Sequence, residues 1–203
     1  MSRGAVLRYL SHPQVLVDPN VPVPEWGLSD VGAARVDALC KAVTDGALAG
    51  TMSVFTSPER KARDTALPLA AALGCACTTI EDSFENDRSA TGYLPGPAFE
   101  AMADAFFAQP DVSVHGWERA VDAQARITAC LHRIAESAPC GDVLIVGHGA
   151  VGTLLWCRQS GHPISRSHDQ GPGGGGNVIV FERSTLASLG GWRPMENLIP
   201  NAG

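Results

Sequence analysis

The amino-acid sequence predicts an α/β protein, a three-layer α/β/α sandwich with a mostly parallel central sheet. Strand-like and helix-like segments alternate along the chain, which is typical of that architecture. The segments 5–11 and 142–147 are apolar nearly throughout, as strands buried on both faces are. The chain has 203 residues, enough for one sizeable domain, so we expect a single domain over residues 1–203.

The individual elements follow from periodicity and from residues that start and stop helices. Ser29 has the hydroxyl of a helix N-cap. Ser57 and Pro58 are a hydroxyl cap followed by a proline at the first helical position, and Gly74 would end that helix. The expected order is strand 5–11, proline-rich loop 18–26, helix 29–46, strand 53–56, helix 57–73, strand 75–80, polar irregular segment 81–97, helix 99–109, helix 117–137, strand 142–147, helix 149–159, flexible glycine-rich connection 171–176 and strand 177–182.

Composition and charge limit the classes of function. The chain is 45% hydrophobic and 18% charged, which is ordinary for a soluble globular protein. The formal net charge of -6 gives a phosphate backbone no basic face, so we expect no nucleic-acid partner. No segment approaches the ~18 apolar residues of a membrane span, and the amino terminus lacks the apolar stretch of a signal peptide. We therefore expect a cytoplasmic enzyme without a membrane partner; nothing in the sequence indicates an oligomeric state.

The six cysteines do not predict a metal site. Cys75 and Cys77 are spaced C-x-C, and no second pair follows at zinc-finger spacing. With a good core and no secretion signal, reduced cysteines are expected. The alternative is a disulfide-dependent secreted protein, and titration of free thiols in denaturant distinguishes the two.

Two histidines follow apolar strand-like segments. His12 ends the first and is followed by Pro13, which forces the chain out of the strand. His148 ends the strand 142–147 and lies between two glycines, which allow a tight turn and close approach to a ligand. Each alone could be structural. Together at the carboxyl edge of a sheet they can act as a nucleophile and a charge stabiliser.

Two further segments carry charge that suits the same edge. Arg60, Lys61 and Arg63 lie in the first turns of the predicted helix, where free N–H groups also favour anions. The plainer interpretation is a capped helix with Glu59 and Arg63 as a solvated i,i+4 pair. Glu85, in a polar loop, becomes significant if a leaving oxygen needs a proton. The glycine run 171–176 lacks the Gly-Lys-Ser/Thr ending of a phosphate-binding loop, so we expect a mobile surface loop.

Taken in order, these segments resemble the histidine phosphatase superfamily, also called the phosphoglycerate mutase-like proteins, over roughly residues 5–155. The family pattern begins with a strand ending Arg-His-Gly and a Trp-x-Leu-Thr/Ser-x-x-Gly stretch. A helix start with the pattern Ser-Pro/x-x-x-Arg-Ala-x-x-Thr-Ala follows, then a loop glutamate and a second His-Gly. The matching segments are Ser11-His12-Pro13, Trp26-Gly27-Leu28-Ser29-Asp30-Val31-Gly32, Ser57-Pro58-Glu59-Arg60-Lys61-Ala62-Arg63-Asp64-Thr65-Ala66, Glu85 and Gly147-His148-Gly149.

The chain departs from the family pattern at two phosphate-binding positions. Ser11 stands where the family has an arginine before the nucleophilic histidine, and Lys61 stands where it has the arginine before alanine. Arg8 lies four strand residues from His12, about 13 Å away, too far to replace the first. Arg88, in the loop with Glu85, is the better candidate, followed by Arg60.

The resemblance implies a phosphomonoester hydrolase that works through a phosphohistidine on His12, with Glu85 as proton donor and then base. His148, Lys61, Arg60 and Arg88 would stabilise the phosphoryl oxygens, and Ser11 would add a neutral hydrogen bond. It implies a small phosphorylated substrate and no metal or other cofactor. Lysine supplies charge without the planar two-point contact of arginine, and an Arg-to-Ser change should reduce the rate.

Two alternatives remain open at this stage. One is phosphoryl transfer of the phosphoglycerate mutase type, which needs a second anionic subsite that the sequence does not show. The other is a catalytically weakened member that binds a phosphorylated ligand or a partner. The loops 13–27 and 86–116 are expected to form the pocket walls, where Trp26 and Tyr93 could contact the substrate; Trp117 is more typical of a core residue.

Overall fold

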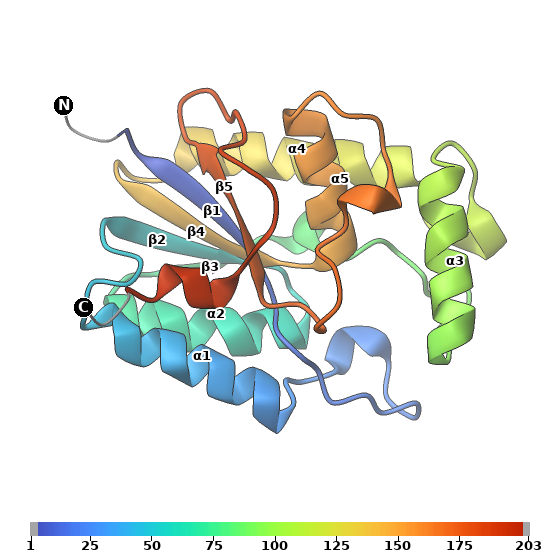
Figure 1. Cartoon of the computed structure of the whole chain (residues 1–203), viewed down its shortest axis with the longest axis horizontal. Coiled ribbons are helices and arrows are strands. Elements are labelled where there is room, and N and C mark those ends of the chain that lie inside the picture. Colours follow the sequence, from blue (N-terminus) through green and yellow to red (C-terminus); the bar gives the residue numbers. More distant parts are fainter. Residues whose placement is uncertain (1–3, 201–203) are drawn as a thin grey trace.

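The computed structural model describes residues 4–200, and its centre is one six-stranded sheet (Figure 1). The strand order is β3-β2-β4-β1-β5-β6. β1 to β4 are mutually parallel where they pair, and β5 and β6 are antiparallel to their neighbours. The strands are β1 (Val6–Ser11), β2 (Thr51–Thr56), β3 (Cys77–Thr79), β4 (Asp142–Gly147), β5 (Asn177–Glu182) and β6 (Arg193–Pro194).

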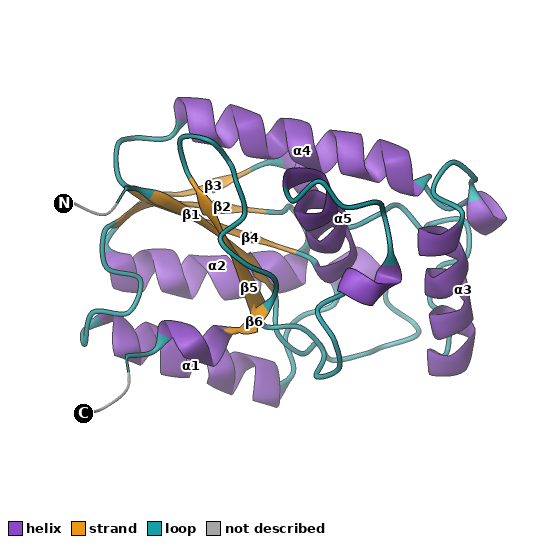
Figure 2. Cartoon of the chain, turned by 45° about the horizontal axis from the view of Figure 1, so that its top comes forward, coloured by secondary structure: helices purple, strands orange, loops and turns teal. Residues whose placement is uncertain are grey.

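Helices cover both faces of this sheet, so the predicted three-layer α/β/α fold is confirmed. In Figures 1 and 2, α1 and α2 lie on one side and α4 and α5 on the other, while α3 stands beyond the end of the sheet. The helices are α1 (Asp30–Val43), α2 (Arg60–Leu73), α3 (Gly96–Ala108), α4 (Ala120–Ser137) and α5 (Gly149–Gln159). None of the helices between residues 4 and 200 combines the length and apolar character that crossing a membrane requires.

Alternation along the buried strands builds the two cores. Leu7 and Tyr9 of β1 face the core under α4 and α5, whereas Leu10 faces the core under α1 and α2. In β4, Ile145 joins the first core and Leu144 the second. Successive side chains of a strand point to opposite faces, so an entirely apolar strand serves both layers. This explains why β1 and β4 read as continuous apolar runs.

The parallel register of β1 and β4 places both histidines at one edge. Ser11 pairs with Gly147, so the next residues, His12 and His148, leave the sheet side by side. The backbone N–H of His12 donates to the carbonyl of Gly147 at 3.0 Å. The carboxyl edge of the sheet is therefore the place to search for a site.

The predicted start of the second helix was wrong. α2 begins at Arg60 with Glu59 at the N-cap position, and no side chain caps it. The hydroxyl of Ser57 is used elsewhere: it contacts His148 and accepts the backbone N–H of Glu59 at 3.3 Å. Ser57 and Pro58 thus form a non-helical connection between β2 and α2. The short β6 was not predicted.

Candidate active site

The two histidine rings face each other at the carboxyl edge of β1 and β4. Their centroids lie 5.3 Å apart with an angle of 71° between the planes. His148 is fully buried, and His12 is partly exposed. The sequence predicted this juxtaposition from the two strand ends alone.

The hydrogen bonding of His12 leaves one ring nitrogen with a lone pair. Nδ1 lies 2.8 Å from the carbonyl oxygen of Pro13, which can only accept, so Nδ1 carries the hydrogen. Nε2 is then the basic and nucleophilic nitrogen. Burial lowers the pKa of His12 to about 4, although the Pro13 carbonyl opposes the shift. The ring is therefore neutral near pH 7, as a nucleophile must be.

His148 is held by Tyr9 and Ser57. Its backbone N–H donates to the Tyr9 hydroxyl at 3.0 Å, and its Nε2 lies 2.7 Å from Ser57 Oγ. Nδ1 is buried and has no hydrogen-bond partner among the described residues. Burial lowers the pKa of His148 well below its usual value, against the attraction of Glu59. When Ser57 donates to Nε2, Nδ1 carries the hydrogen and can donate to a ligand.

The glycines beside His148 make room for neighbouring side chains. A Cβ at Gly147 would lie 2.3 Å from the Tyr9 hydroxyl, and one at Gly149 would lie 2.1 Å from Nε2 of Gln170. Neither contact is possible between real atoms. Gly147 is thus required for close packing around His148, whereas a side chain at position 149 would displace the flexible end of Gln170.

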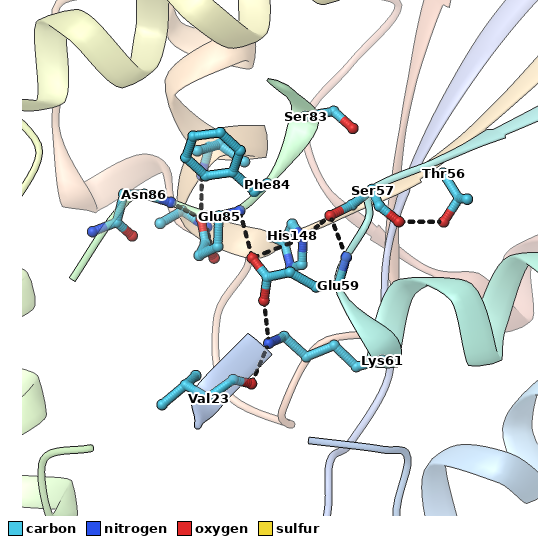
Figure 3. Close-up of polar contacts among 12 residues, drawn as sticks. Val23, Thr56, Ser57, Glu59, Lys61, Ser83, Phe84, Glu85, Asn86 and His148 are labelled. Carbon is cyan, nitrogen blue, oxygen red and sulfur yellow. Dashed lines mark hydrogen bonds and ion pairs between the residues drawn. The ribbon is translucent and has the colours of Figure 1, made fainter. Parts of the chain in front are cut away.

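Glu59 and Lys61 form a buried ion pair next to His148 (Figure 3). Glu59 is 8% exposed and Lys61 is 3% exposed. Lys61 also donates to the carbonyl of Val23 at 2.9 Å, which ties the proline-rich loop to the site. Burial would raise the pKa of Glu59, but His148, Lys61 and the N–H of Glu85 lower it to about 2. Glu59 is an anion that pairs with Lys61, whereas the plainer of the two interpretations of this segment paired it with Arg63.

Glu85 sits over the first turn of α5. One carboxylate oxygen accepts the backbone N–H of Val151 at 3.0 Å and the other that of Ala150 at 3.2 Å. Helix N-termini favour such an anion. Burial nevertheless raises the pKa of Glu85, although Arg88 opposes the shift. A carboxyl group with a raised pKa can hold a proton and release it.

A cavity of about 780 Å³ lies beside His12 and Glu85. His12, Glu85 and Arg88 line it, together with residues 171–175 of the glycine-rich connection. The Arg88 guanidinium lies over the Phe99 ring, 5.1 Å from its centroid. At Gly175 a Cβ would lie 2.1 Å from the His12 carbonyl oxygen, and φ is +91°, so only glycine passes this close.

A second cavity, of about 720 Å³, adjoins the first at Glu85, Asn86 and Arg88. Residues 19–25 form much of its wall, in agreement with the loop expected there, and Glu59 and Tyr93 also line it. Trp26 and Tyr93 form an edge-on pair with centroids 5.6 Å apart. Trp117 is 2% exposed and lies in the core, as predicted.

Three of the four predicted phosphate-binding residues, Ser11, Arg60 and Lys61, do not line the cavity that contains His12. The Ser11 hydroxyl is buried and donates to Oε1 of Gln170 at 2.6 Å. The Arg60 guanidinium is largely exposed and lies 3.5 Å from Asp64 on the next turn of α2. It lines neither cavity. Arg88 is thus the predicted arginine that reaches the cavity containing His12.

Sequence reasoning missed several contributors to the site. Glu59 was assigned to a solvated pair, Ser57 to a helix cap, and Gln170 and Asn86 were not singled out. Asn86 is 3% exposed, and its Nδ2 has no partner among the described residues. The signal for Glu59 was present: a carboxylate two residues from Lys61, inside a motif that resembles a phosphate-binding segment.

No group of three or more His, Cys, Asp or Glu side chains within residues 4–200 is placed to hold a metal ion. This part of the chain therefore gives no candidate metal site.

Fold and site together define an α/β protein with paired histidines at the carboxyl edge of its sheet. The family model described as histidine phosphatase superfamily (branch 1) matches residues 21–185. The chain belongs to this superfamily. The matched range contains Glu85 and His148 and begins after His12. Comparison with curated proteins gave no match.

Solved structures share the fold. A chain titled mycobacterial hydrolase 1 superposes with a TM-score of 0.71 at 21% identity, covering 94% of this chain and 96% of its own. The mycobacterial glucosyl-3-phosphoglycerate phosphatase complexed with VO3 gives 0.70 at 20% identity, over 93% and 96%. Phosphoglycerate mutase from Bacillus anthracis gives 0.70 at 16% identity, over 97% and 96%. These likenesses concern the fold, which is phosphoglycerate mutase-like.

Proposed function

We propose that the protein is a phosphatase that hydrolyses phosphate monoesters through a phosphohistidine on His12. The observation that carries the proposal is the pair of neutral imidazoles facing each other at 5.3 Å beside a cavity. Nε2 of His12 has a lone pair because Nδ1 is bonded to Pro13. Membership of the superfamily supports the same chemistry.

The reaction has two steps. Nε2 of His12 attacks phosphorus, and the bond from phosphorus to the leaving oxygen breaks with its electron pair. Glu85 gives its proton to that oxygen, so the product is an alcohol. Water then attacks the phosphohistidine and passes a proton to Glu85, while the N–P bond breaks and returns the lone pair to His12. The raised pKa of Glu85 suits both directions of proton transfer.

Charge on the phosphoryl oxygens is stabilised by donors around the cavity. Nδ1 of His148 is available because nothing among the described residues bonds to it. Arg88 supplies a positive charge from the cavity wall. Lys61 approaches the same region, but Glu59 already holds its ammonium group. Such donors are effective because a partly enclosed site strengthens them.

Hydrolysis is favoured over mutase-type transfer by the charges that line the cavity with His12. A mutase must hold a second anionic group of its substrate. The other arginine on this wall is Arg166, and it is paired with Glu100 and Asp104. The second anion site that a mutase needs therefore has no evident cation.

A catalytically weakened, ligand-binding member is the second candidate. Ser11 and Lys61 in place of arginines favour it, since a neutral hydroxyl and a neutralised ammonium bind a phosphoryl group less strongly. His12, His148 and Glu85 favour the enzyme. Turnover separates the two candidates.

The test is phosphate release from a panel of phosphomonoesters by wild type and by His12→Asn. We expect a loss of at least about 10³-fold in the variant, because covalent catalysis needs the ring nitrogen. His132→Asn is the matched control, because His132 is exposed on α4. Equal release by wild type and His12→Asn contradicts the nucleophile assignment. Binding of a phosphomonoester by wild type with no release of inorganic phosphate supports the second candidate.

A further inference from the structure

Two hydrogen-bond donors suited to an oxyanion converge on the carboxylate of Glu59, and the ring of His148 lies beside it (Figure 3). The ammonium of Lys61 contacts one oxygen. The other oxygen accepts the backbone N–H of Glu85 at 2.8 Å and lies 3.5 Å from Nε2 of His148. An ammonium group and a backbone N–H are groups that commonly bind a phosphoryl group. Here the protein's own carboxylate occupies them.

The charges of the buried groups around the facing rings nearly cancel. Glu59 is an anion and Lys61 neutralises it. Both rings are uncharged, since burial disfavours the imidazolium in each. On the cavity wall, Arg88 and Arg166 are accompanied by three carboxyl groups, so this wall adds no net positive charge; the carboxyl groups belong to Glu85, Glu100 and Asp169. A site with this balance offers little attraction to a ligand that brings two negative charges, because desolvating a charge requires compensation.

The donors left for a ligand are few and mostly neutral. Asn86 Nδ2 is buried, has no partner among the described residues and belongs to a residue that lines both cavities. Nδ1 of His148 is likewise buried without a partner. With Arg88, these make one cationic and two neutral donors. That set suits a tetrahedral group carrying one negative charge.

We propose that Glu59 is a specificity-determining residue, an internal counter-anion that makes the site select singly charged phosphoryl groups over dianionic ones. Such groups are phosphate diesters, or monoesters in their monoanionic form. The inference rests on the proposed function in one respect: the phosphoryl group binds at the cavity wall beside His12 and next to the ring of His148. It concerns ligand charge, and binding can test it without turnover.

The experiment measures the dissociation constants of sulfate, a dianion, and methyl sulfate, a monoanion of similar shape, at pH 8. Ring resonances of His12 and His148 followed by NMR report affinity and location together. We expect wild type to bind methyl sulfate at least as tightly as sulfate. Glu59→Gln keeps the shape of the side chain and removes its charge, and it should tighten sulfate binding about tenfold while changing methyl sulfate binding less than about threefold.

Two controls separate a local effect from a general change in charge. Glu136→Gln alters net charge equally at an exposed position on α4 that lines neither cavity, and it should leave both constants unchanged. Lys61→Met should weaken sulfate binding, the opposite sign to Glu59→Gln. The double variant, Glu59→Gln with Lys61→Met, removes the pair as a neutral unit and should retain the wild-type preference, which keeps the test valid should Glu59→Gln fail to fold.

The inference is overturned by wild type binding sulfate ten times more tightly than methyl sulfate, or by Glu59→Gln leaving the ratio unchanged. These results leave the phosphatase proposal standing, since that proposal is tested separately by phosphate release from wild type and His12→Asn. A kinetic experiment distinguishes the two kinds of singly charged substrate, a phosphate diester and a monoester in its monoanionic form. It compares methyl phenyl phosphate, a diester, with phenyl phosphate at pH 5, below its second pKa of about 6; the faster reaction identifies the substrate class.

Discussion

Two buried ion pairs lie near opposite ends of the same parallel strands. At the amino end, Arg8 of β1 contacts Asp142 of β4 at 2.9 Å, and Asp142 also accepts the backbone N–H of Val6. At the carboxyl end, Glu59 and Lys61 pair beside His148. The first pair joins two strands. The second pair lies beside the ring of His148 and the backbone of Glu85. A buried ion pair therefore stabilises the sheet at one end and belongs to the candidate site at the other.

The contrast shows how location decides the role of a charge. Arg8, four residues before His12, holds the sheet together and does not reach the site, as strand geometry predicted. Lys61 stands in a phosphate-binding motif, yet its ammonium group is held by a carboxylate two residues away. Substitutions at the amino end should therefore change the free energy of unfolding, and substitutions at the site should change kcat.

The largest expected effect is at Glu85, on the site side of the comparison. Glu85→Gln keeps one of the two oxygens that accept backbone N–H groups of α5 and cannot transfer a proton, so kcat for an alkyl phosphate should fall by about 10²–10³-fold. With p-nitrophenyl phosphate, whose leaving group needs little protonation, the first step should be much less affected. Steady-state and burst kinetics with both substrates measure this. An equal loss with both contradicts the acid role.

The next effect is on stability at the amino end. Asp142→Ala leaves Arg8 buried without this partner and should lower the free energy of unfolding by about 3–5 kcal/mol. Activity per folded molecule should stay at the wild-type level, because the pair is remote from His12. Urea unfolding and activity at a temperature where the variant is folded test both halves. A large loss of kcat with unchanged stability would reverse the assigned roles.

The smallest expected effect is the part of the pH dependence of stability that comes from His12. Its pKa is about 4 in the folded protein and 6.5 in the unfolded chain, so the unfolded state binds more protons between these values. Stability from this group is therefore complete above pH 6.5 and is lost as pH falls toward 4. Between pH 7 and pH 5 the loss should be roughly 1–2 kcal/mol. In His12→Asn this part of the pH dependence should vanish, whereas His132→Asn should keep it.

The fold could be predicted from the sequence because the patterns that indicate it are formed by residues close together in the chain. Apolar runs at β1 and β4 and the alternation of strands and helices predicted the layers, and the two strand ends predicted the facing histidines. The start of α2 was not readable, because the Ser57 hydroxyl bonds to His148, 91 residues away in sequence. Tertiary contacts redirected a residue with a strong local preference.

The site was only partly predictable for the same reason. His12, His148 and Glu85 follow from strand ends and motif order. Gln170 reaches Ser11 across 159 residues, and the Glu59 carboxylate contacts the backbone of Glu85 and the ring of His148. No periodicity or cap rule reveals such contacts. The ion pair between Glu59 and Lys61 leaves one trace in the sequence, which is a lysine at a position where the family has an arginine.

The central claim is that His12 carries the phosphoryl group during the reaction, and trapping that intermediate tests it most directly. Glu85→Gln is mixed with p-nitrophenyl phosphate, quenched with base within milliseconds, and digested for peptide mapping by mass spectrometry. We expect phosphate on the peptide containing His12, attached at Nε2 by ³¹P NMR, and none in the double variant with His12→Asn. Phosphate found on His148, or release of phosphate with no labelled histidine, would contradict the account.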